Sequence, residues 1–155
     1  MRQTLSNFLN EIKDRDVYLL HDDLFHFKTF NSYNLGITEP TIVTIACGLA
    51  SQGKHVIIYS LAGFTLYRAF DQIKFYLSHT KYTGNVIFCN AGGGLAVNCY
   101  PKYMGESHRI RDDYDICKLL NLNLYTPNNK KEFLELLKNK LYSETCFIRL
   151  GIDGV

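Results

Sequence analysis

The sequence has no long uninterrupted run of apolar residues. A membrane-spanning helix needs about 18 or more such residues in succession, and no segment of the 155 residues approaches that length. The N-terminal segment, MRQTLSNFLNEIKDRD, alternates polar and apolar residues instead of carrying the apolar stretch of a secretory signal. These absences predict a protein with no membrane association, and we expect it in the cytoplasm.

Cysteines are present, but no pairing pattern connects them. No Cys-x-x-Cys pair occurs, and the total of five is odd. Structural zinc sites and disulfide frameworks need regular spacings or an even count, so neither is predicted. Reduced, mostly buried thiols are expected instead, at Cys47, Cys89, Cys99, Cys117 and Cys146.

Excess charge of one sign and phosphate-binding motifs are also missing. The formal net charge is +2, and Lys130-Lys131 is the longest basic run, so nucleic-acid binding is not predicted. The run Gly92-Gly93-Gly94 has neither the G-x-G-x-x-G spacing nor the Gly-Lys-Ser/Thr of a phosphate loop. We therefore expect a tight turn beside an active site there, and a free-standing nucleotide-binding protein is the least favoured class.

Strand-like and helix-like segments alternate along the chain. Buried strands are predicted at 17–20, 55–59, 85–89, 122–125 and 146–150, and helices at 4–13, 41–50, 68–77, 112–120 and 131–141. A polar loop is expected over 21–35. The alternation predicts a single α/β domain over 1–155 with a mainly parallel sheet. Ligands of such sheets bind beyond the carboxyl ends of the strands, so the loops starting at His21, Ser60 and Asn90 are the ones to search.

Two motifs carry a family resemblance. Asn34-Leu35-Gly36-Ile37-Thr38-Glu39-Pro40 precedes an apolar helix, and Tyr67-Arg68-Ala69-Phe70-Asp71-Gln72-Ile73 follows the second predicted strand. They resemble the N-x-G-I-x-E-x and R-A-F/Y-D-Q-I motifs of the transketolase and deoxyxylulose-phosphate synthase family. Gly105-Glu106-Ser107-His108 and the last strand, Phe147-Ile148-Arg149-Leu150, are similar to further family segments. The resemblance covers nearly the whole chain and implies a three-layer thiamine-diphosphate-binding (pyrimidine) domain.

Glu39 is the catalytic and cofactor-binding acid that the resemblance implies. Thiamine diphosphate reacts at its thiazolium carbon, and its own aminopyrimidine removes the proton there. A carboxylic acid bonded to the pyrimidine ring nitrogen supports this by sharing a proton with that nitrogen, more readily in a cleft of low dielectric. Acidic residues at helix starts also stabilise the helix N-terminus. This second role for Glu39 stays open.

Phe64 and His108 also belong to the implied site. Phe64, after the second strand, is the candidate aromatic ring against the aminopyrimidine, although an ungapped alignment from Arg68 places the family's stacking phenylalanine nearer Thr65. A place in the hydrophobic core is the alternative for Phe64. His108 resembles the family histidine that contacts the substrate, and an ordinary surface-loop histidine is the alternative. Asp23 matches the family's acidic position after the first strand and is expected to face another subunit.

The sequence contains no G-D-G motif, which in family enzymes holds the cofactor's diphosphate through Mg²⁺ on a separate domain. The resemblance therefore implies a second subunit that supplies this domain and holds the Mg²⁺, with no metal ligand in the present chain. A dimer or a heterotetramer with two copies of each chain is expected. The chain alone is expected to be inactive.

The predicted function is that of a subunit of a split transketolase-like enzyme, which transfers a two-carbon ketol unit between sugar-type substrates. Two alternatives remain. One is a subunit of a thiamine-diphosphate-dependent 2-oxoacid decarboxylase or dehydrogenase, and the other is a non-catalytic scaffold of the same fold. The His108 segment favours ketol transfer. A buried acid at Glu39 speaks against a scaffold, because burying a carboxylate is costly.

Overall fold

The computed structural model describes residues 1–78, 82–92 and 112–150. Six strands form one sheet in the order β2-β1-β3-β4-β6-β5. They are β1 (Val17–His21), β2 (Ser32–Asn34), β3 (His55–Leu61), β4 (Val86–Ala91), β5 (Leu124–Tyr125) and β6 (Cys146–Leu150). All five strand pairings are parallel. The predicted α/β fold with a mainly parallel sheet is confirmed.

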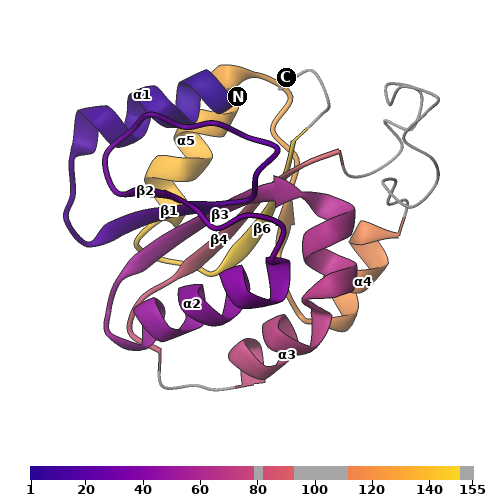
Figure 1. Ribbon diagram of the computed structural model, residues 1–155. Coiled ribbons are helices and arrows are strands. Elements are labelled where there is room, and N and C mark those ends of the chain that lie inside the picture. The colour runs from indigo at the N-terminus through magenta and orange to yellow at the C-terminus, as the bar shows by residue number, and fades with distance from the viewer. Residues whose placement is uncertain (79–81, 93–111, 151–155) are drawn as a thin grey trace.

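Helices cover both faces of this sheet, so the domain has three layers (Figure 1). One face carries α1 (Arg2–Ile12) and α5 (Lys130–Lys140). The other carries α2 (Glu39–Ser51), α3 (Phe70–Ser78) and α4 (Asp113–Leu119). A π-helix, η1 (Phe64–Arg68), lies between β3 and α3. The three-layer arrangement agrees with the prediction.

The hydrophobic core is divided into two parts by the sheet. Successive side chains of a strand point to opposite faces, so Ile57 and Ile58 of β3 enter different layers. Ile57 packs in the cluster that contains Phe8 of α1 and Phe133 of α5. Ile58 packs in the cluster that contains Ile42 of α2. The central strands are therefore apolar on both sides, which is why short Val/Ile-rich runs predict them.

Two predicted segments differ from the structure in the kind of element that they contain. The loop expected over 21–35 contains β2, whose residues are polar and partly exposed and carry no alternating apolar pattern. Backbone pairing with β1 alone makes this edge segment a strand, with Tyr33 opposite Leu20. The helix expected over 68–77 is interrupted, because Arg68 is the last residue of η1 and α3 begins at Phe70. A π-turn has no characteristic spacing of apolar residues by which it could be predicted from the sequence.

Candidate functional site

A cavity of about 210 Å³ lies beyond the carboxyl ends of β1 and β3. Residues from three separate segments line it: Asp22, Asp23 and Leu24 after β1, Ile37 and Glu39 at the start of α2, and Phe64 and Arg68 of η1. Its position is the one that a parallel sheet predicts for a ligand site. Glu39 and Phe64, two of the three predicted site residues, therefore share one cavity.

A specific turn places Glu39 at this cavity. The Asn34 side chain accepts a hydrogen bond from the Gly36 backbone N–H at 2.9 Å, which is the bond of an Asx turn. Gly36 has a φ of 73°, a conformation that residues with a Cβ rarely adopt. The Thr38 hydroxyl then donates to the Leu35 carbonyl at 2.8 Å. The NLGITEP motif thus encodes a tight entry into α2.

Glu39 is the first residue of α2, and only 2% of its surface is exposed. Its carboxylate is paired, because Arg68 Nη1 donates to Glu39 Oε1 at 2.8 Å. No sequence pattern indicates this partner, since the two residues lie in different motifs. The pair explains how a carboxylate is tolerated in so buried a place.

Phe64 lies in η1 and is also buried. The Arg68 guanidinium carbon lies 3.8 Å from the centroid of the Phe64 ring, a cation–π contact. Thr65, the residue that an ungapped alignment favours for stacking, is buried and accepts a hydrogen bond from Asn90 Nδ2 at 2.8 Å. A π-turn accommodates one residue more than an α-turn. Phe64, not Thr65, lines the cavity.

Asp22 is a second buried acid at the cavity, which sequence reasoning missed. It is 1% exposed, and the Ser60 hydroxyl donates to its Oδ2 at 2.5 Å. Burial raises the pKa of the Asp22 carboxyl, and the nearby Glu39 charge adds to the rise. The sequence singled out Asp23, which lines the same cavity but is exposed. No pattern in the sequence indicates the burial of Asp22, because β1 is buried on both faces and shows no alternation that would continue to this residue.

Other predicted features lie elsewhere. His108, Cys99, Gly93 and Gly94 fall outside the described residues. In the described part of the chain, Cys47, Cys89, Cys117 and Cys146 are free thiols, mostly buried as predicted. Burial raises the pKa of Cys47 to about 11 and that of Cys146 to about 12. Neither a cluster of three potential metal ligands nor a helix able to cross a membrane occurs within residues 1–78, 82–92 and 112–150.

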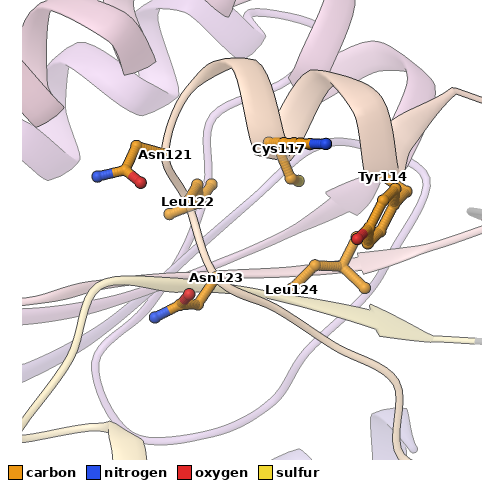
Figure 2. Close-up of a pocket in the computed structure, with 7 residues that line it drawn as sticks. Tyr114, Cys117, Asn121, Leu122, Asn123 and Leu124 are labelled. Atoms are coloured by element: carbon orange, nitrogen blue, oxygen red, sulfur yellow. The ribbon is translucent and has the colours of Figure 1, made fainter.

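A different cavity, of about 300 Å³, lies beside α4 at the amino end of β5 (Figure 2). It is lined by residues of α4, of the segment between α4 and β5, and of β5 itself: Tyr114, Cys117, Lys118, Asn121, Leu122, Asn123 and Leu124. The predicted site residues do not contribute to this lining. Its place, at the opposite end of the strands from Glu39, makes it the less favoured candidate for a ligand site.

Known proteins similar in sequence are transketolase subunits, although no family model matches the chain. An apulose-4-phosphate transketolase subunit of Phocaeicola vulgatus is 28% identical over 122 residues, covering 77% of this chain and 37% of that protein. The subunit of the same name from Actinobacillus succinogenes is 25% identical over 123 residues, covering 78% of this chain and 37% of that protein. The chain thus corresponds to less than half the length of the curated relatives it matches.

A solved structure shares the fold. A split-gene transketolase, described as an inactive beta4 tetramer, superposes with a TM-score of 0.78 at 24% identity. The match covers 99% of this chain and 52% of that chain. Sequence and fold agree with the resemblance that the motifs carry. The chain is therefore similar in sequence to transketolase subunits and has the fold of a transketolase pyrimidine domain.

Proposed function

We propose that this chain is one subunit of a thiamine-diphosphate-dependent enzyme that transfers a two-carbon ketol unit between sugar-type substrates. The observation that carries the proposal is Glu39, a carboxyl 2% exposed on a cavity beyond the strand ends, with the Phe64 ring on the same cavity. When bound, thiamine diphosphate supplies the nucleophilic carbon that accepts the two-carbon unit. An acid and an aromatic ring are the groups that fit the aminopyrimidine of this cofactor.

Glu39 would hold a proton between its carboxyl oxygen and the pyrimidine ring nitrogen. The low-dielectric surroundings of a buried carboxyl strengthen such a bond. Phe64 would pack against the flat face of the ring, which contributes about 0.5–1.5 kcal/mol beyond area burial when two aromatic systems meet. Because Glu39 lies in the first turn of α2 and Phe64 lies in η1, both side chains would orient the cofactor without rearrangement of α2.

The cavity in this chain suits part of a ligand. Complete small-molecule sites occupy about 300–1,000 Å³, whereas this cavity measures about 210 Å³. A partner subunit would contribute the remainder, holding the diphosphate and Mg²⁺, in a dimer or a heterotetramer. The relatives that are named as subunits of a transketolase support this arrangement. His108 would contact the sugar substrate from the segment after β4.

A non-catalytic scaffold is the second candidate, and one observation favours it. Arg68 Nη1 already neutralises the Glu39 carboxylate at 2.8 Å. A carboxylate with only a structural role needs this partner and no ligand. The two candidates differ in what happens when Glu39 loses its charge. A scaffold would lose an ion pair, whereas the enzyme would lose its reaction.

The test is a calorimetric titration of thiamine diphosphate and Mg²⁺ into the chain, alone and mixed with a neighbouring-gene product that carries a G-D-G domain. We expect tight binding and ketol transfer only in the mixture. Apulose 4-phosphate, which appears in the relatives' names, is the first donor to try. Glu39→Gln should lower the turnover number about a hundred- to ten-thousandfold.

Glu11→Gln, an exposed change of the same chemistry on α1, is the matched control and should leave turnover unchanged. Full activity of Glu39→Gln, or absence of cofactor binding in the mixture, would contradict the catalytic assignment and leave the scaffold.

A further inference from the structure

The Arg68 guanidinium occupies both contact surfaces of the cavity at once. It donates a hydrogen bond to Glu39 Oε1 at 2.8 Å and lies over the Phe64 ring at 3.8 Å from its centroid. A guanidinium is flat, carries several N–H donors and stacks on aromatic faces. In the chain by itself, the acid and the ring are therefore satisfied by a residue of the same chain.

These are the two contacts that the proposed function assigns to the aminopyrimidine, which is also flat and bonds through ring and exocyclic nitrogens. Glu39 and Phe64 cannot offer the same oxygen and the same ring face to two planar groups. The inference rests on the proposed function at this point. Either the cofactor ring uses the other Glu39 oxygen and the other face of the Phe64 ring, or Arg68 leaves first.

Arg68 is the member of the three that is free to move. Its side chain is 44% exposed, whereas Glu39 is anchored at the start of α2 and Phe64 is 8% exposed. Because the Arg68 side chain is partly exposed, water weakens its contacts with the buried Phe64 ring and the buried Glu39 carboxylate from the arginine side. Rotation of the arginine side chain into solvent would open the cavity while the backbone of α2 and η1 stays in place.

We propose that Arg68 is a placeholder that closes the site in the unliganded chain and that the cofactor's aminopyrimidine must displace it. The contact is autoinhibitory, since it lowers the affinity of the chain for the ring that Glu39 and Phe64 are shaped to bind. It also keeps a buried carboxylate paired until a ligand arrives.

The test measures binding of the free aminopyrimidine half of thiamine to the full chain, by NMR chemical-shift titration at a pH where this fragment is neutral. Removing the competitor in Arg68→Gln should tighten binding about three- to thirtyfold. Arg15→Gln removes an exposed arginine at the other end of β1 and should bind like the wild type. Arg68→Lys retains the charge but loses the planar fork, so its affinity should lie between those of the wild type and Arg68→Gln.

The dependence of fragment affinity on ionic strength is a second test, because it should not change if Arg68 has only a structural role. Raising salt from about 0.01 M to about 1 M shortens the screening length from about 30 Å to about 3 Å, which weakens the Arg68–Glu39 pair. Wild-type affinity for the neutral fragment should then rise by up to about fivefold, and that of Arg68→Gln should stay constant.

Equal or weaker binding by Arg68→Gln, with both proteins binding the fragment, would overturn the placeholder and leave the proposed function intact. If no variant binds the fragment, and the partner mixture does not bind thiamine diphosphate, the proposed function fails and the placeholder fails with it.

Discussion

At the scale of single residues, the cavity brings two buried acids together with one arginine. Glu39 has Arg68 as its partner, whereas Asp22 is held by neutral donors, the Ser60 hydroxyl and the Leu24 backbone N–H. Burial therefore raises the pKa of Asp22. The ionised form of Asp22 costs folding free energy that a neutral side chain of the same shape would not.

Asp22→Asn tests this cost through its pH dependence. Below the unfolded-state pKa of about 3.9, Asp22 is protonated in both states and contributes no penalty. As pH rises from there through the raised pKa of the folded state, the unfolded state ionises first, so wild-type stability falls. We expect the stability of Asp22→Asn relative to wild type to increase between pH 4 and pH 8 in denaturant unfolding. A difference that is constant with pH would contradict this account.

At the scale of elements, the approach of β4 to β3 depends on a glycine. A Cβ added to Gly84, just before β4, would lie 1.8 Å from the Lys54 carbonyl oxygen, just before β3. Gly84 also donates its backbone N–H to the Ala50 carbonyl at the end of α2, at 3.0 Å. Three elements therefore meet at a point where backbone packs against backbone.

Gly84→Ala should destabilise the fold by about 2–3 kcal/mol, because the backbone itself must move to admit the methyl group. Gly48→Ala is the matched control: a Cβ there meets nothing within 4 Å, and alanine favours a helix interior over glycine by about 1 kcal/mol. The two variants should shift the denaturation midpoint in opposite directions. A neutral or stabilising Gly84→Ala would show that the β3–β4 start is not tightly packed.

The elements differ in how far their residues predicted them. Strands β3 and β4 were predicted because buried parallel strands are continuous apolar runs, and α2 because apolar residues follow NLGITEP. The strand β2 and the π-turn of η1 were not predicted, because the surrounding structure and not a pattern of apolar residues determines their geometry. For the same reason, Glu39 and Phe64 could be placed on one site from motifs, while the Arg68 contact and the burial of Asp22 required the assembled fold.

At the scale of the whole molecule, a buried ion pair joins two of the three layers. Arg149 of β6 donates to both carboxylate oxygens of Asp113 at the start of α4, at 2.6 and 2.7 Å. Asp113 is fully buried, at 0% exposure. The pair fixes the first turn of α4 against the sheet, on the side where the strands end.

Arg149→Met should destabilise the protein by about 3 kcal/mol at neutral pH, because it leaves the Asp113 carboxylate buried without a positively charged partner. The double variant Asp113→Asn/Arg149→Met should recover much of that loss, since neither charge then remains. Denaturant unfolding of the two single variants and the double variant measures the coupling. Additive effects in this cycle would mean that the pair does not hold α4 to the sheet.

The two edges of the sheet are its shortest strands, with three residues in β2 and two in β5. A long exposed edge strand is a template on which another polypeptide can add a strand, and short edges blunt that hazard. The described sheet is thus poorly suited to strand addition and to aggregation by this route. Within residues 1–78, 82–92 and 112–150, the surfaces better suited to association with another polypeptide are the helix faces and the loops at the strand ends, where Glu39 lies.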